Sequence, residues 1–229
     1  MFIDRSMTRE VITVSPETGI LATQSLMARN GIRHLPVIDE DGILVGVVTD
    51  RDIRSAMPST VLSEAEKAAE QRRLEAMKVK DIMTVNPVTV SPTQTLEDAL
   101  LLMQKVKVGA FPVVDQEGKL QGIISVRDLM RAFVNVLGLE EPGTLLGIVV
   151  ENKIGQMKRI VDAITETGVS FGSILVSRVW EEGKRAVFPY LLTNNISKVK
   201  NHLREKGFTL LDPMEWYLDR VPKRKAEKE

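Results

Sequence analysis

The sequence predicts an α+β protein, built from two similar repeats followed by a smaller domain of different design. The first observation behind this is an internal duplication. Residues 7–54 align with residues 83–130 at a constant shift of 76 residues, without a gap, and about a third of the aligned positions are identical. The second observation is that the hydrophobic periodicity restarts after residue 143 in another order. A duplication outranks other signals because it fixes the domain organisation first.

Each repeat is predicted to run strand, helix, strand, strand, helix (βαββα). In the first repeat a short alternating strand ends at Val14, and Ser15-Pro16 supplies an N-cap followed by proline, so we expect a helix to begin there. The apolar run 35–38, the turn 39–42 and the run 44–48 then predict a hairpin that leads into a second helix. The second repeat shows the same signals 76 residues later.

The rest of the chain divides into a charged linker and a third domain. Residues 63–80 are rich in Glu, Lys, Arg and Ala, which is typical of an exposed helix. After 143 the pattern is strand, helix, strand, strand, helix, strand, the ferredoxin-like split βαβ order (βαββαβ). The predicted bounds are 1–58 for the first repeat, 59–79 for the linker, 80–138 for the second repeat, 139–143 for an interdomain turn, 144–213 for the third domain and 214–229 for a charged tail.

Composition excludes several classes of function. The formal net charge of zero argues against a nucleic-acid partner, which would need a basic field. Cysteine is absent, so thiol catalysis and cysteine metal ligands are excluded. His202 has no second histidine or acidic cluster at ligand spacing, so no metal site is predicted. The chain has no long apolar run, so we expect no membrane span and a cytoplasmic protein.

Both repeats end in the same short motif, whose chemistry allows two interpretations. Thr49, Arg51 and Asp52 in the first repeat correspond to Ser125, Arg127 and Asp128 in the second. A hydroxyl followed three residues later by an acid is a helix capping box. A helix N-terminus with a hydroxyl and an arginine is also an anion site, and a carboxylate there can accept from both hydroxyls of a ribose. The two interpretations are compatible.

The repeats differ just before their second strand. The first has Arg33-His34 where the second has Gly109-Ala110. Charge-assisted bonds to phosphate are strong, so the first repeat offers cationic donors that the second lacks. The structural alternative is that Arg33 is a solvated surface charge and His34 a packed or exposed imidazole. Phosphate recognition is therefore expected to be asymmetric.

These motifs carry a resemblance to a known family. The Met-Thr openings, the Pro-Val-(Ile/Val)-Asp strands and the Gly-x-x-Thr/Ser-x-x-Asp endings resemble a tandem pair of CBS domains, called a Bateman module. The third domain resembles an ACT domain, and the whole chain is similar to the AcuB-like proteins named for acetoin utilisation. The resemblance implies that Asp52 and Asp128 bind ribose, while Thr49 and Ser125 contact ribose or phosphate. It also implies a ligand among AMP, ADP, ATP, S-adenosylmethionine and dinucleotides.

The resemblance also marks a turn in the third domain. Asn152, Lys153, Ile154 and Gly155 stand where ACT domains commonly read Asp-x-Pro-Gly and bind an amino acid. Gly155 fits that pattern, whereas Asn152 and Ile154 depart from it. Loss of the carboxylate removes the natural partner of an amino group.

The function indicated is a non-catalytic regulator that binds an adenosyl ligand and passes a conformational change to the third domain or to a partner. No catalytic residues are predicted, because no nucleophile stands beside a plausible base in the sequence pattern. The alternative is a ligand-independent scaffold that self-associates and docks a metabolic enzyme. In either case we expect a homodimer.

Overall fold

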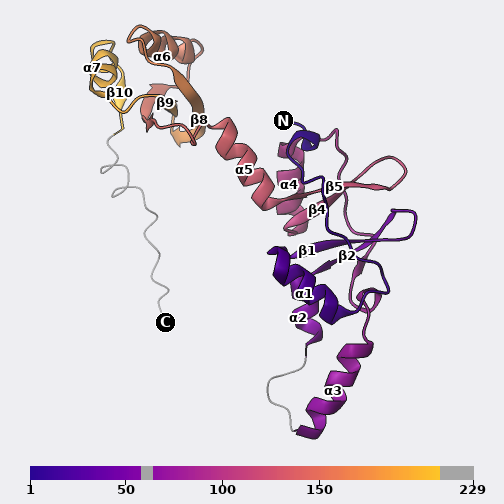
Figure 1. Cartoon of the computed structure of the whole chain (residues 1–229). Coiled ribbons are helices and arrows are strands. Elements are labelled where there is room, and N and C mark those ends of the chain that lie inside the picture. Colours follow the sequence, from indigo (N-terminus) through magenta and orange to yellow (C-terminus); the bar gives the residue numbers. More distant parts are fainter. Residues whose placement is uncertain (58–63, 212–229) are drawn as a thin grey trace. The chain divides into compact units, whose positions relative to one another are not determined.

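This computed structural model describes residues 1–57 and 64–211, without the side chains of 64–68 and 178–179. Contacts within the chain divide it into two compact units, Met1–Arg131 and Ala132–Glu229. The first unit holds the first repeat, the linker and the second repeat as far as Arg131, and the second holds the end of α5 (Val126–Val136) and the third domain (Figure 1). The predicted tail at 214–229 lies outside the described residues, and the predicted domain bounds stay predictions.

The two repeats fold alike, element for element. The first contains α1 (Ile20–Asn30), β1 (His34–Ile38), β2 (Leu44–Thr49) and α2 (Asp50–Ala56). The second contains α4 (Leu96–Val106), β4 (Ala110–Val114), β5 (Leu120–Ser125) and α5 (Val126–Val136). Each pair of strands is antiparallel, and β1–β2 and β4–β5 have the same register, with an irregularity before the last residue of β1 and of β4. The predicted hairpins and second helices are confirmed.

The predicted start of the first helix of each repeat is wrong by four residues. α1 has Gly19 as its N-cap, and α4 has Thr95, whose hydroxyl accepts a hydrogen bond from the Asp98 amide at 3.1 Å. The Ser-Pro pairs form turns instead, and the Ser91 amide donates to the Gln94 side chain at 2.8 Å. The N-cap residues that follow are extended. Helical dihedrals therefore begin only after the turn is complete.

The opening segment of each repeat joins the sheet of the other repeat. Thr8 exchanges two backbone hydrogen bonds with Ile123 of β5, each 2.9 Å long. The equivalent strand of the second repeat, β3 (Thr84–Val85), pairs with β2 of the first. The short alternating strands expected before Ser15 and Ser91 are reduced to single parallel bridges, Val14 to Val37 and Val90 to Val113. The repeats are therefore interlocked by exchanged segments.

Short 3-10 turns continue this exchange further along the openings. In η1 (Ile3–Arg5) the Ile3 amide donates to the Gln94 carbonyl at 2.9 Å, and in η2 (Val79–Asp81) the Val79 amide donates to the Thr18 carbonyl at 2.8 Å. Val79 is fully buried in the core of the first repeat, although it lies at the C-terminal end of the predicted linker. The core of the first repeat thus includes a residue that follows α3 (Glu64–Ala76) in sequence.

Two glycines permit the exchanged segments to approach closely. A Cβ atom on Gly46 would lie 3.0 Å from the Thr84 carbonyl oxygen, and one on Gly122 would lie 2.9 Å from the Thr8 carbonyl oxygen. Methionine sulfurs of the openings, from Met83 and Met7, would lie closer still. The backbone can pass at these points only because no side chain is present.

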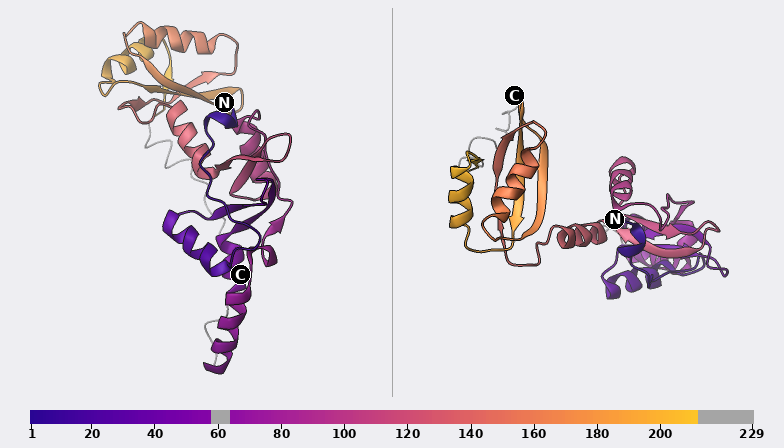
Figure 2. Two further views of the ribbon diagram at one scale, coloured as in Figure 1. Left: turned by 45° about the vertical axis from the view of Figure 1, so that its right-hand side comes forward. Right: turned by 90° about the horizontal axis from the view of Figure 1, so that it is seen from above.

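The linker helix α3 (Glu64–Ala76) stands clear of the two sheets and extends from the first repeat (Figure 2). Only its C-terminal turn is anchored in the described contacts. Leu74 is 5% exposed, and the Arg73 guanidinium donates to the Ala56 carbonyl at 2.8 Å. The charged composition predicted such an exposed helix, and α3 confirms it.

The second unit has the predicted βαββαβ order, with its first strand broken in two. Its elements are β6 (Thr144–Leu145), β7 (Ile148–Glu151), α6 (Gln156–Thr165), β8 (Phe171–Glu181), β9 (Lys184–Leu191), α7 (Ser197–Glu205) and β10 (Thr209–Leu210). The strands are antiparallel; β9 pairs with β6, β7 and β8, and β10 pairs with β7. Buried residues of α6 and α7, including Ile160, Ile164 and Leu203, form the core with the sheet.

Candidate functional site

The repeated motif forms a capping box at the start of both α2 and α5. In the first repeat, Oδ2 of Asp52 accepts from the Thr49 amide at 2.8 Å and from the Thr49 hydroxyl at 2.7 Å. In the second, Oδ2 of Asp128 accepts from the Ser125 amide at 2.8 Å and from the Ser125 hydroxyl at 2.5 Å. The capping interpretation is confirmed in both copies. It engages one oxygen of each carboxylate and leaves Oδ1 for another partner.

The surroundings of the two carboxylates differ. Asp128 is 5% exposed, and its Oδ1 accepts from the Thr8 hydroxyl at 3.4 Å and lies 3.4 Å from a guanidinium nitrogen of Arg131. Asp52 is only half-buried. Within the described parts of the chain, its Oδ1 has no hydrogen-bond or ion-pair partner. The same local motif therefore presents an occupied oxygen in one repeat and an unpaired oxygen in the other.

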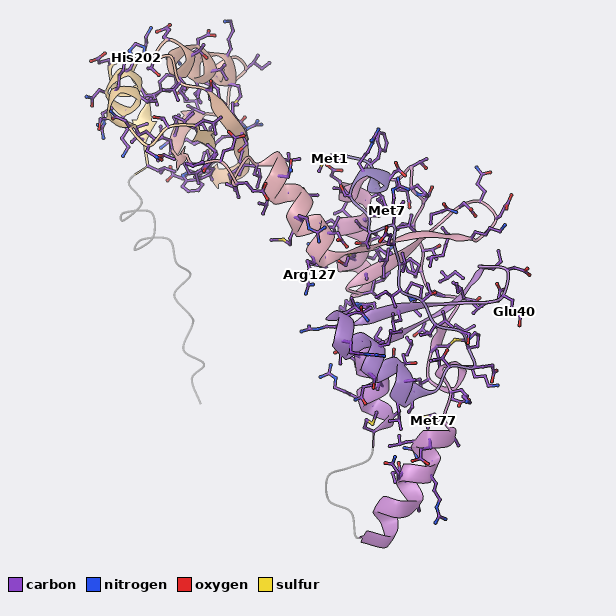
Figure 3. All side chains as sticks on the ribbon, in the orientation of Figure 1. Met1, Met7, Glu40, Met77, Arg127 and His202 are labelled. Atoms are coloured by element: carbon purple, nitrogen blue, oxygen red, sulfur yellow. The ribbon has the colours of Figure 1, made fainter. Side chains whose placement is uncertain are left out.

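A pocket of about 400 Å³ lies beside Asp128, between the two repeats. Its lining residues come from four segments, which supply residues 8, 10–12, 31–34, 109–110, 123, 125–128 and 131. Figure 3 labels Arg127 at the N-terminal end of α5 and Met7 on the opening segment beside β5. The opening segment forms part of the wall because it is paired with β5.

The pocket brings together predicted residues from different repeats. Arg33 and His34 of the first repeat line it with Ser125, Arg127 and Asp128 of the second. The lining does not include Thr49, Arg51 or Asp52, which stand at the start of α2. Arg33 and His34 also stay next to the motif of their own repeat, because His34 is paired with Thr49 and the Asp50 amide donates to the Arg33 carbonyl at 3.0 Å. The N-terminal ends of β1 and β4 meet, and a Cβ on Gly109 would lie 3.3 Å from the His34 ring.

Positive charge gathers in the pocket. Three guanidinium groups, of Arg33, Arg127 and Arg131, face two carboxylates, of Glu10 and Asp128. Arg131 pairs with Asp128, whereas Arg33 and Arg127 have no ion pair with any described residue. Both are exposed to solvent. Unpaired guanidinium groups at a concave surface are well suited to bind a phosphate or carboxylate.

His34 lies half-buried in the wall of the pocket. Burial lowers the pKa of His34 below its ordinary value of 6.5, opposed by the carboxylates of Asp50 and Asp52 and assisted by the cation of Arg33. A neutral imidazole presents one donor and one acceptor to a ligand. His34 therefore adds hydrogen-bonding capacity to the pocket at neutral pH, and not a full charge.

The shift of 76 residues identifies the positions around Asp52 that correspond to this lining. Ser55 stands where the pocket has Arg131, Gly109 where it has Arg33, and Asp50 where it has Val126. Asp50 forms an ion pair with Arg54 at 2.9 Å. The difference in charge between the surroundings of Asp128 and Asp52 is thus larger than Arg33 and His34 alone predicted. Sequence reasoning missed Thr8, Glu10 and Arg131, although the alignment of Arg131 with Ser55 was available as a signal.

The remaining candidates lie in the second unit. Residues 152–155 form an exposed turn, in which Gly155 adopts φ +91° as the N-cap of α6 and Ile154 is fully exposed. Lys153 pairs with Glu151 at 2.6 Å. His202 on α7, labelled in Figure 3, bonds to Glu166 at 2.8 Å.

The described residues contain no group of three or more His, Cys, Asp or Glu side chains arranged to hold a metal ion. Nor do they include a helix long and apolar enough to cross a membrane.

Comparison with known proteins agrees with this architecture. The family model for the CBS domain matches residues 3–59 and 79–135. A CBS domain-containing protein of Dictyostelium discoideum is 38% identical over 139 residues, which are 60% of this chain and 94% of that protein. Among solved structures, CBSX2 in complex with AMP is 31% identical with a TM-score of 0.50, covering 58% of this chain and 96% of that one. AcuB of Vibrio cholerae, named for acetoin utilization, is 28% identical with a TM-score of 0.51, covering 62% and 98%.

The duplicated βαββα unit, the exchanged opening segments and the paired capping carboxylates thus occur in a chain that matches the CBS model twice. A relative covered over almost its whole length shares more than a third of the aligned residues. The chain therefore belongs to the CBS-domain family of proteins.

Proposed function

We propose that the pocket beside Asp128 binds an adenine nucleotide or a related adenosyl ligand, and that the protein is a non-catalytic regulator. The observation that carries this proposal is the convergence of one buried carboxylate and three guanidinium groups on a single pocket. The candidate ligands are AMP, ADP, ATP and S-adenosylmethionine. The arginines favour the three that carry phosphate.

The shape and lining suit such a ligand. A volume of about 400 Å³ falls in the range of small-molecule sites. Asp128 offers a carboxylate to a ribose hydroxyl pair, as acidic residues do in dinucleotide sites. Val11, Ile12 and Ile123 supply apolar surface against which a base can pack. CBSX2, the relative solved with AMP, supports this choice of ligand class.

A second site at Asp52 is part of the proposal. Thr49, Arg51 and Asp52 repeat the geometry of Ser125, Arg127 and Asp128, and one oxygen of Asp52 has no partner among the residues that the structure describes. By the same chemistry Thr49 contacts ribose or phosphate, and Asp52 accepts from ribose. The two sites are then related by the internal duplication.

Helix α5 connects the pocket with the second unit. Arg127, Asp128 and Arg131 lie in its first two turns, and the residues from Ala132 onward belong to the second unit. A ligand that binds these turns can bias the position of the same helix further along. We propose that the second unit is an ACT-type domain that receives this change, and that a metabolic enzyme is the regulated partner. The likeness to AcuB supports a role in acetoin utilisation.

The competing proposal is a scaffold that associates without ligand. It is favoured by large apolar side chains exposed on α4 and α5, where Leu101 is 65% and Met130 59% exposed. Two such helices can pair with their copies around a twofold axis. We expect a homodimer under both proposals, so light scattering at micromolar concentration tests association but does not separate them.

Ligand titration separates the proposals. Thermal unfolding of the full chain is measured with AMP, ADP, ATP, S-adenosylmethionine and adenosine, with GMP as a control for the base. A ligand at 100 times its dissociation constant stabilises the folded state by about 2.7 kcal/mol. Calorimetry on the wild type and on Asp128→Asn then assigns the site. A dimer that responds to none of these ligands contradicts the regulator and supports the scaffold.

A further inference from the structure

We propose that Arg131 makes the Asp128 pocket selective for phosphorylated adenosyl ligands, by occupying the ribose-binding carboxylate until a phosphate draws it away. This inference rests on the proposed function and goes beyond it. It names the residue that decides between a nucleoside and a nucleotide. It also assigns the two sites of the duplicated unit to different ligand classes.

The first step concerns the carboxylate. Oδ2 of Asp128 is engaged by the capping box, so a ribose hydroxyl must reach Oδ1. That oxygen lies 3.4 Å from Arg131 Nη2. The ribose of a nucleoside therefore competes with the Arg131 guanidinium for Asp128 Oδ1. A nucleoside has no phosphate with which Arg131 could form a replacement ion pair.

The second step concerns the phosphate. Arg131 is exposed on its outer side, and its guanidinium also lines the pocket with Arg33 and Arg127. An arginine holds phosphate through two parallel hydrogen bonds, which are stronger than a pair at 3.4 Å. A nucleotide that places its phosphate between these arginines takes Arg131 from Asp128 and frees Oδ1 for the ribose. Phosphate and ribose recognition are then coupled through one side chain.

The third step is the internal comparison. Arg131 lies three residues after Asp128 on α5, and Ser55 holds the same place relative to Asp52 on α2. Oδ1 of Asp52 has no partner among the described residues, and Gly109 replaces Arg33. The Asp52 site thus has neither the competing cation nor the additional phosphate ligand. We infer that it accepts adenosine and AMP with similar affinity.

The test measures adenosine and AMP binding by calorimetry in an Asp52→Asn background, so that only the Asp128 pocket contributes. Arg131→Gln keeps the length of the side chain and removes its charge. It should weaken AMP by about tenfold, through loss of a charge-assisted phosphate contact. It should raise the affinity for adenosine by about threefold, because Arg131 no longer pairs with Asp128. Arg29→Gln, on the exposed face of α1 and outside the pocket, is the matched control and should change neither affinity.

The reverse substitution is made in the other repeat. Ser55→Arg in an Asp128→Asn background should weaken adenosine and introduce a preference for AMP. Equal losses of adenosine and AMP affinity in Arg131→Gln, with an unchanged melting temperature, would overturn the inference and leave the proposed function standing. If the Asp52→Asn protein with Arg131 intact binds neither ligand while wild type binds both, the inference is overturned as well. If wild type binds neither ligand, the proposed function fails together with the inference.

Discussion

The N-terminal turns of α2 and α5 have the same hydrogen bonds but different neighbours. In both, a hydroxyl and an acid three residues apart form a reciprocal cap. Around Asp128 the neighbours are Thr8, Arg131 and a pocket with two further arginines; around Asp52 the corresponding positions hold Thr84, Ser55 and Gly109. The duplication thus preserved the capping hydrogen bonds of the two helices, whereas the side chains around them differ between the repeats. Four predictions test this comparison.

The largest effect is expected from the carboxylate of the pocket. Asp128→Ala should weaken AMP by roughly 1.5–3 kcal/mol, because a bond to a charged acceptor is lost. It should also lower the free energy of unfolding by about 1 kcal/mol, the usual cost of a helix cap. Calorimetry and urea denaturation measure the two quantities.

Asp52→Ala is the matched variant for that experiment. It should show the same loss of stability, since it removes the same cap, but should leave the tighter AMP site intact. A large loss of stability with unchanged nucleotide affinity in both variants would reduce the two acids to helix caps.

A second prediction uses the glycines at the two crossing points. Gly122→Ala and Gly46→Ala should each cost about 2 kcal/mol of unfolding free energy, because the added Cβ approaches a backbone carbonyl of the exchanged segment. Only Gly122→Ala should also weaken AMP at the Asp128 pocket, since it displaces Thr8. Equal effects on AMP from both variants would show that the opening segment is not part of that site.

Arg33 provides a third and smaller effect. Arg33→Ala should weaken ATP and ADP by about 1.4 kcal/mol, or tenfold, and adenosine much less. Measured in the Asp52→Asn background, Asp128→Ala should instead weaken adenosine as well as ATP and ADP at this pocket, which separates ribose from phosphate recognition. Arg5→Ala, an exposed arginine of η1, serves as the control. An equal loss for adenosine and ATP would return Arg33 to the role of a solvated surface charge.

The smallest effect concerns pH. Folding lowers the pKa of His34 below its ordinary value of about 6.5. At a pH between the folded-state pKa and 6.5, the unfolded chain therefore binds more protons than the folded protein. Stability should therefore fall as the pH drops through 6.5 toward the folded-state pKa, and be fully present above 6.5. His34→Ala, which copies Ala110 of the second repeat, should flatten this dependence in urea denaturation at pH 5 and pH 8. An unchanged slope would place the imidazole in solvent.

Much of the architecture follows from the sequence because its signals are local or periodic. The hairpins at 39–42 and 115–118, the capping boxes and the order of the third domain depend on residues within a few positions of each other. The predicted starts of α1 and α4 are wrong because a Ser-Pro pair can open either a helix or a turn. The residues that follow the turns, Gly19 and Thr95, form β-bridges to Lys78 and Phe2. These bridges keep Gly19 and Thr95 extended, so each helix begins only after them.

By itself the sequence determined that the chain contains two similar repeats and that each repeat has a capping acid near its end. It also determined that Arg33 and His34 have no cationic counterparts at Gly109 and Ala110. Only the tertiary structure decided that these two residues line one pocket with Asp128 of the other repeat. This placement depends on how β1 meets β4 and on the pairing of Thr8 with Ile123. The pairing of Thr8 with Ile123 joins backbone groups 115 positions apart. Backbone amides and carbonyls carry no residue identity, so the local pattern of side chains cannot specify which segments they join.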